Sequence, residues 1–206
     1  MQDREPFTPD RLFCPGPTPV PQSVQRALIA NTGVYHRSEE FYRVVKRAQE
    51  LLAPMFGTKL PPVILTASGT GGLEAALTAL AAPGDPVTLV NAGKFGERWE
   101  KLAQVFALEP SIVRIEAGHA PTAAQIVAAI KPTTKAVFLQ ANETSTGAYF
   151  GIETLVPEIR RSFKGFIVVD AISSLGAHAM RMDEWGIDAV VAGSQKGFGL
   201  PPGLAS

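Results

Sequence analysis

A single lysine after a strand-like run is the first residue of this sequence that could do covalent chemistry. Lys196 follows the run 188–192 and lies in a segment rich in glycine and proline, GSQKGFGLPPG. A lysine amine with a lowered pKa is a nucleophile that forms imines with carbonyl compounds. A solvated lysine at a strand end would give the same pattern, so the neighbouring motifs must decide between the two interpretations.

The segment 67–77, ASGTGGLEAAL, is typical of an anion site at the start of a helix. Ser68, Gly69 and Thr70 precede an apolar helical pattern, so free backbone N–H groups and the positive end of a helix dipole lie together. The segment is not a G-x-G-x-x-G loop, because Glu74 stands where the last glycine belongs, and it lacks the P-loop pattern. A phosphate site is favoured over a nucleotide loop, and a tight turn without ligand is the alternative.

Asp170 ends the apolar run 166–170, FIVVD, where a buried carboxylate costs free energy unless a partner meets it. It either caps a helix that begins at Ala171 or pairs with the cation of a ligand. A lysine, an aspartate and an anion site together are what pyridoxal 5'-phosphate requires. They supply an amine for the imine, an acid that keeps the pyridine nitrogen protonated, and donors for the phosphate.

These residues need a scaffold that brings them to one edge, and the hydrophobic pattern predicts one. Continuous apolar runs that alternate with helical patterns predict a parallel sheet covered on both faces, with ligands beyond the carboxyl ends of the strands. Some helices begin at capping-type residues such as Ser38 and Thr70. The predicted strands are 63–67, 87–91, 111–115, 136–140, 166–170 and 188–192; the predicted helices lie near 20–30, 38–56, 71–81, 94–107, 121–131 and 152–163.

The composition favours a small-molecule ligand. The 206 residues are 46% hydrophobic and carry 19 basic and 19 acidic side chains, which argues against nucleic acid and against an anionic membrane surface as partners. The one cysteine, Cys14, excludes an internal disulfide and a cysteine-built zinc site, and we expect no metal. The first ten residues have no signal-peptide pattern, and no apolar run approaches the roughly 20 residues of a membrane helix. We therefore expect a cytoplasmic protein.

Ordered motifs along the chain resemble one family. CPGPTPVP, YHRSEEF, ASGTGGLEAAL, NETSTG, VDAISSLG and GSQKGFGLPPG occur in this order. From about Leu12 onward the chain resembles the class V aminotransferases of pyridoxal-phosphate fold type I, specifically the alanine–glyoxylate and serine–pyruvate aminotransferase group. The resemblance implies an α/β large domain with a mostly parallel central sheet between helical layers. It also implies a homodimer that transfers an amino group from a small amino acid, alanine or serine, to a small 2-oxo acid, glyoxylate or pyruvate.

The same resemblance assigns roles to single residues. It implies that Lys196 forms the Schiff base with pyridoxal phosphate and that Asp170 pairs with the pyridine nitrogen. It further implies contacts of the phosphate with Ser68, Gly69, Thr70 and Gln195, of the ring hydroxyl or nitrogen region with Thr144, of the ring faces with Ile172 and Phe95, and of the substrate mouth with Gly16.

The family pattern also predicts the domain organisation. Residues 1–19 are expected to form an N-terminal arm, and residues 20–206 a large domain that is incomplete at its C-terminal end. The small domain, with the arginine that binds the substrate carboxylate, is expected to be absent. The 206 residues alone are therefore expected to bind pyridoxal phosphate weakly and to show no transamination. Two alternatives stay open. One is a related class V lyase such as a cysteine desulfurase, which usually has histidine in place of Gln195 and Phe95. The other is a non-catalytic fragment that only binds or associates.

Overall fold

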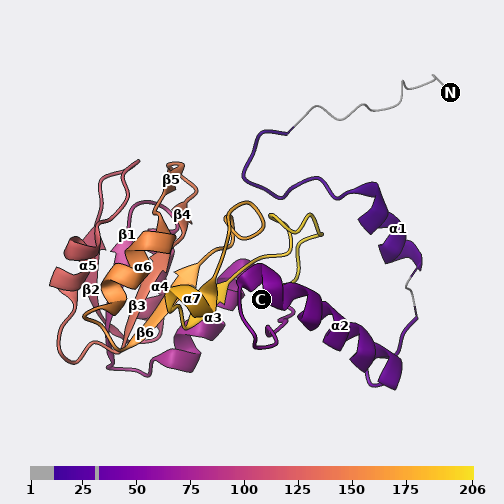
Figure 1. The fold of residues 1–206 in the computed structure, drawn as a ribbon, viewed down its shortest axis with the longest axis horizontal. Helices are drawn as coiled ribbons and strands as arrows, with labels where there is room; N and C mark the ends of the chain where they lie inside the picture. The colour runs from indigo at the N-terminus through magenta and orange to yellow at the C-terminus, as the bar shows by residue number, and fades with distance from the viewer. Residues whose placement is uncertain (1–11, 31–32) are drawn as a thin grey trace.

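Five parallel strands form the centre of the molecule. The computed structural model describes residues 12–30 and 33–206. The sheet has the order β2-β1-β3-β6-β7, and every neighbouring pair is parallel (Figure 1). Five of the six predicted strands are confirmed, as β1 (Pro86–Asn91), β2 (Glu109–Arg114), β3 (Ala136–Gln140), β6 (Phe166–Asp170) and β7 (Ala189–Val191).

Helices cover both faces of this sheet, as the continuous apolar strands predict. The side chains of β3 alternate between two cores. Phe138 packs with the helices of one face, α3 (Gly69–Leu80) and α4 (Gly96–Val105), while Leu139 packs with those of the other, α5 (Ala123–Ala129) and α6 (Ile152–Arg160). The fold is the predicted α/β large domain with a covered parallel sheet.

The predicted strand 63–67 is wrong. Leu65 alone forms a β-bridge, an antiparallel pair with Ala205 whose two hydrogen bonds measure 2.8 and 2.9 Å. Ala205 also bridges Gly193, which follows β7. An apolar run becomes a strand only where a neighbouring backbone offers a ladder of partners, and here only one residue has such a partner.

Two short elements escape the sequence pattern. A hairpin of β4 (Asn142–Glu143) and β5 (Ala148–Tyr149) follows β3, and the four-residue helix α7 (Met182–Trp185) precedes β7. The start of α3 also differs from the prediction. Ser68, not Thr70, is its N-cap, because the Ser68 hydroxyl accepts a hydrogen bond from the Gly71 amide at 3.2 Å.

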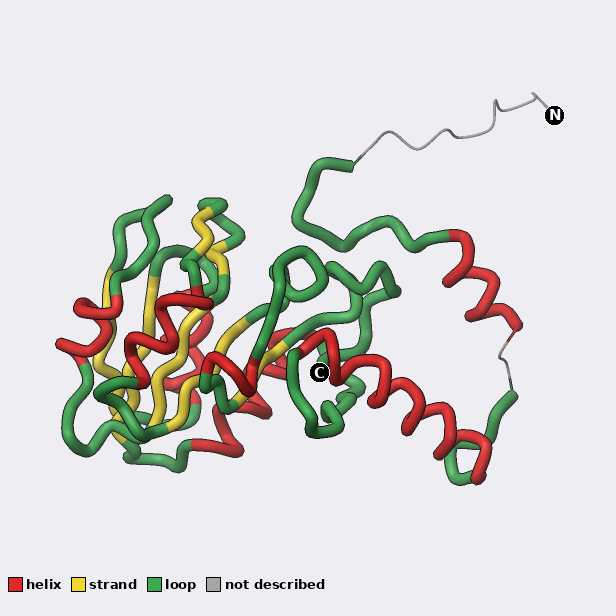
Figure 2. Tube along the Cα trace, viewed as in Figure 1, coloured by secondary structure: helices red, strands yellow, loops and turns green. Residues whose placement is uncertain are grey.

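Most of the described N-terminal part lies away from the sheet, and only Leu52 and Phe56 pack against the core on one of its faces. Residues 12–21 contain no helix or strand, and α1 (Gln22–Ala30) and α2 (Glu39–Phe56) extend away from the sheet (Figures 1 and 2). Ser38 caps α2 as predicted. Many apolar side chains of these helices are exposed: Leu28, Ile29, Phe41, Tyr42, Val44, Leu51 and Met55. None of the helices in the described ranges has the length and hydropathy to cross a membrane.

Candidate active site

The carboxyl ends of β6 and β7 bring the predicted acid and amine to one edge of the sheet. β6 ends at Asp170, which lies in register with Val191 of β7. β7 then leads through Gly193 into the turn that holds Lys196. This is the edge at which open parallel sheets bind ligands.

The side chain of Lys196 faces the N-terminal segment. Its Nζ donates a hydrogen bond to the Pro15 carbonyl at 3.0 Å. Gly16 lies alongside, since a Cβ there would come within 2.7 Å of Lys196 Cδ. The contact is fixed through the backbone: the Thr18 amide donates to the Gln195 carbonyl, and the Thr18 hydroxyl to the Lys196 carbonyl, both at 2.9 Å. The residues around Gly16 therefore form one wall beside the amine.

The surroundings of Lys196 make its amine more nucleophilic. Burial lowers the pKa of Lys196 from its usual value, and the positive charge of Arg98 acts in the same direction. The electrostatic influence of Cys14 and Asp170 on the amine raises the pKa and opposes part of this change. A lowered pKa increases the neutral fraction of the amine, which is the form that attacks a carbonyl carbon.

The Asp170 carboxyl is buried, with 5% of its surface exposed, and is only partly satisfied. Its Oδ1 accepts a hydrogen bond from the Ile172 amide at 3.0 Å, and no other described group donates to it. Burial raises the pKa of Asp170 to about 6, although the charges of Arg98 and Lys196 lower it. The neighbouring Glu143 raises it further. A cation at Asp170 would therefore stabilise the ionised carboxylate.

The start of α3 offers donors for an anion. The Ser68 hydroxyl is used as the helix cap, but the amides of Gly69 and Thr70 have no acceptor within the helix. The carboxamide of Gln195 makes no hydrogen bond to any residue in the described ranges, and its Oε1 is buried. Two amides, a helix dipole and a free carboxamide thus remain available to a phosphate.

Ile172 lies between this anion site and the lysine turn. A Cβ on Gly69 would lie 2.5 Å from Ile172 Cδ1, and one on Gly193 would lie 3.4 Å from Ile172 Cγ2. Ile172 itself is buried at 7% exposure and follows Asp170 by two residues. It therefore provides an apolar surface at the meeting point of α3, β6 and the turn after β7.

Phe95 and Thr144 come from two loops on the same side of the sheet. The Thr144 hydroxyl donates to Ser173 Oγ at 2.9 Å, which joins it to the segment after Asp170. Phe95 is the N-cap residue of α4, and the Arg98 guanidinium lies 4.9 Å from the centre of its ring. The structure thus brings all of the predicted site residues to the carboxyl side of the sheet, and their roles stay predictions.

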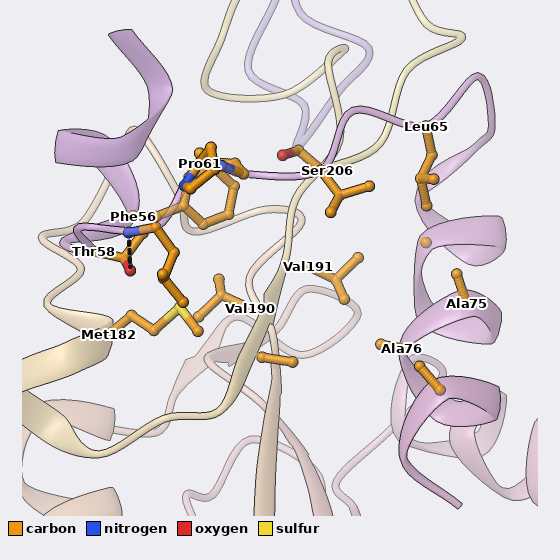
Figure 3. Close-up of a pocket in the computed structure, with 16 residues that line it drawn as sticks. Phe56, Thr58, Pro61, Leu65, Ala75, Ala76, Met182, Val190, Val191 and Ser206 are labelled. Carbon is orange, nitrogen blue, oxygen red and sulfur yellow. Dashed lines mark hydrogen bonds between the residues drawn. The ribbon is translucent and has the colours of Figure 1, made fainter. Parts of the chain in front are cut away.

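A separate cavity of about 390 Å³ lies beside β7 (Figure 3). Phe56, Met182 and Val190 line one part of it, and Ala75 and Ala76 of α3 line another. None of the predicted site residues contributes to its wall. Its surface is largely apolar, so it lacks the charged groups and donors that a phosphorylated ligand needs.

Comparison with known proteins identifies the family of the chain. The family Aminotransferase class-V matches residues 12–205. The chain belongs to the class V aminotransferases. Membership in this family implies pyridoxal 5'-phosphate as the cofactor.

Relatives from several bacteria resemble this class V chain. It is 37% identical to the L-aspartate–glyoxylate aminotransferase of Paracoccus denitrificans over 204 residues, which are 94% of this chain and 50% of that protein. It is 36% identical to the soluble hydrogenase 42 kDa subunit of Anabaena cylindrica over 197 residues, 94% of this chain and 51% of that protein. The solved alanine–glyoxylate aminotransferase of Nostoc sp. superposes with a TM-score of 0.88 at 30% identity, over 100% of this chain and 55% of that one.

The class V chain spans about half the length of the curated relatives that it matches. The described residues fit the implied cofactor on three observations. Asp170 has a carboxylate oxygen without a donor, Gln195 has an uncommitted carboxamide, and the first amides of α3 lack acceptors. Lys196 supplies the amine at the same edge.

Sequence reasoning missed two residues of this class V site. Glu143 belongs to a quoted motif, but nothing in the sequence shows that its carboxylate reaches the loop of Phe95. Arg98 follows Phe95 by three residues on α4, a spacing that places two side chains on one helix face and could have revealed it.

Proposed function

We propose that this class V chain forms the cofactor-binding part of a pyridoxal-phosphate-dependent aminotransferase. Its donors would be small amino acids such as alanine or serine, and its acceptors small 2-oxo acids such as glyoxylate or pyruvate. The observation that carries the proposal is the convergence of Lys196, the buried Asp170 and the start of α3 at one sheet edge. The names of relatives support the reaction type, and among them is a serine–glyoxylate aminotransferase from Methylorubrum extorquens at 35% identity.

Each group has a chemical task in this proposal. When bound, the cofactor supplies an aldehyde that joins an amine and a protonated ring that withdraws electrons from the α-carbon of an amino acid. Lys196, with its lowered pKa, is the amine that holds the cofactor and then carries a proton to or from the α-carbon. Asp170, whose second carboxylate oxygen accepts no hydrogen bond from the described residues, would hold a proton on the ring nitrogen.

The remaining predicted residues orient the cofactor and substrate. Ser68, Gly69, Thr70 and Gln195 would bind the phosphate through the donors at the start of α3. Ile172 and Phe95 would bound the two faces of the ring, and Thr144 would bind its polar edge. Gly16, beside the lysine amine, would line the substrate entrance. Residues 20–206 would form the cofactor domain; of the predicted arm, residues 1–19, the first eleven lie outside the described residues.

We also propose a homodimer as the functional unit. The exposed apolar side chains of α2 support it, since contiguous apolar surface on a soluble protein marks an interaction site. Analytical ultracentrifugation is expected to give a dimer, and Val44→Lys with Leu51→Lys is expected to shift it toward monomer. Unchanged association of the double variant would contradict this interface. The cytoplasmic location stays a prediction.

A single-turnover experiment tests the activity. The full-length protein that contains this chain is saturated with pyridoxal phosphate, alanine or serine is added, and the conversion of cofactor to pyridoxamine phosphate is followed by absorbance. We expect conversion by this protein and none by its Lys196→Arg variant. Binding without conversion would favour the non-catalytic alternative, and release of sulfide from cysteine would favour the desulfurase.

A further inference from the structure

Glu143 is a fully buried carboxylate that the proposed chemistry does not use. Its side chain has 0% exposure and comes from the hairpin that also holds Thr144. Oε2 accepts hydrogen bonds from the Phe95 and Gly96 amides, each at 3.1 Å. Oε1 accepts from the Ser145 amide at 3.1 Å and from the Ser145 hydroxyl at 2.6 Å. Both oxygens are occupied, so this carboxylate is not itself a ligand site.

Its partners show what it does to α4. Phe95, the N-cap residue of α4, has no capping side chain of its own, so the carboxylate of Glu143 caps the helix from 47 residues away in sequence. A negative charge at this position also interacts favourably with the helix dipole. The fit is close, because a Cβ on Gly93 would lie 2.8 Å from Glu143 Cγ and Cδ. A further hydrogen bond joins the loop before α4 to the β4–β5 hairpin, because the Lys94 amide donates to Ser145 Oγ at 3.1 Å.

This cap connects two walls of the candidate site. The hairpin residue next to Glu143 is Thr144, whose hydroxyl donates to Ser173 beyond Asp170. The amide that Glu143 holds belongs to Phe95, the residue proposed to cover the ring. A movement of the cap would therefore displace Phe95 relative to Thr144 and Asp170.

We infer that Glu143 is a positioning residue that fixes Phe95 against the cofactor site by capping α4 from the β4–β5 hairpin. The inference rests on the proposed function for the meaning of Phe95, but the position of Phe95 is measurable without any cofactor. Glutamine is the informative substitution, because a carboxamide has nearly the same shape but only one acceptor oxygen. The NH2 group of the glutamine would replace the second oxygen and face an N–H or O–H donor, so that donor would lose its acceptor.

The test compares Glu143→Gln with a matched carboxylate-to-amide control. Glu153→Gln changes an exposed glutamate in the first turn of α6 that accepts one hydrogen bond, from the Tyr149 hydroxyl at 2.8 Å. Hydrogen exchange of the Phe95 and Gly96 amides is measured first on chains without cofactor. We expect protection to fall about tenfold or more in Glu143→Gln and to stay unchanged in Glu153→Gln, as expected when hydrogen bonds to a charged acceptor are lost.

A second readout uses bound pyridoxal phosphate. The visible circular dichroism of the bound cofactor reports how its surroundings hold the ring, so we expect a weaker band in Glu143→Gln with cofactor still attached at Lys196. If Glu143→Gln does not fold, Ser145→Ala keeps the carboxylate and removes one of its donors, and a smaller change in the same direction is expected. Protection and dichroism equal to those of the natural chain in a folded Glu143→Gln would overturn the inference.

The two ideas fail in different ways. A natural chain that shows no cofactor dichroism and no adduct at Lys196 would overturn the proposed function. The exchange rates of Phe95 and Gly96 would still decide whether Glu143 holds α4 in place. Loss of protection in both glutamine variants would also overturn the inference, because the effect would then not be specific to the cap.

Discussion

Two buried carboxylates at neighbouring points of one sheet edge have opposite surroundings. Glu143 accepts hydrogen bonds from four donors, three backbone amides and one hydroxyl, so both oxygens are satisfied within the protein. Asp170 accepts one, from Ile172, and burial raises its pKa to about 6. A satisfied carboxylate holds the fold together, whereas a buried and unsatisfied one costs stability that a ligand can return. The difference in hydrogen bonding supports a structural role for Glu143 and is consistent with the ligand-binding role proposed for Asp170.

The largest expected effect is on turnover in Asp170→Asn. An amide cannot hold the proton on the ring nitrogen as a carboxylate does, so single-turnover conversion with alanine should slow by roughly three decades or more. Cofactor attachment at Lys196 should persist, as measured by absorbance. If Asp170 only caps a turn, the variant would instead show normal turnover. Asp170 would then have a structural role, as Glu143 has.

The second effect concerns stability as a function of pH, without cofactor. The folded-state pKa of Asp170 is raised from 3.8 to about 6, so the folded state binds more protons than the unfolded state between these values. The protonated Asp170 therefore adds to the free energy of unfolding. This stabilisation is fully present below about pH 4 and is lost as the pH rises through about 6, which lowers the free energy of unfolding by roughly 3 kcal/mol. In urea unfolding, the stability of Asp170→Asn relative to the natural chain should therefore increase between pH 4 and 7. A constant difference across this range would contradict the raised pKa.

The third effect sharpens the comparison at a single pH. At pH 7, Glu143→Gln should reduce the free energy of unfolding by about 2 kcal/mol, because a buried donor loses its acceptor. Asp170→Asn without cofactor should be neutral or stabilising at the same pH. Chemical denaturation of both variants gives the two numbers. Equal losses would mean that the two carboxylates do not differ in the way that their hydrogen bonds indicate.

The smallest effect is expected at the start of α3. Ser68→Ala removes the side-chain cap of this helix and should cost about 1 kcal/mol in thermal or urea unfolding. Under the proposed function, the same change should weaken pyridoxal phosphate binding, measured by titration. A variant with lowered stability and unchanged affinity would leave Ser68 as a cap with no part in the phosphate site.

The sequence predicts the sheet and the chemical groups well, for physical reasons. Continuous apolar runs become strands wherever neighbouring strands supply partners, as in 136–140, and the same pattern fails at 63–67 where only Leu65 has one. Asp170 ends one such run and Lys196 follows another by a short turn, so the sheet edge at which they lie follows from the fold. The cap formed by Glu143 could not be predicted, since it depends on a hairpin of two two-residue strands that meets a helix end far away in sequence.

The most direct test of the central claim is to trap the cofactor. The natural chain is incubated with pyridoxal phosphate, reduced with borohydride, digested and mapped by mass spectrometry. Lys94 and Lys164 serve as internal controls, because both are exposed lysines on the same chain. The account predicts a pyridoxyl group on Lys196. An adduct confined to Lys94 or Lys164, or no adduct at all, would contradict it.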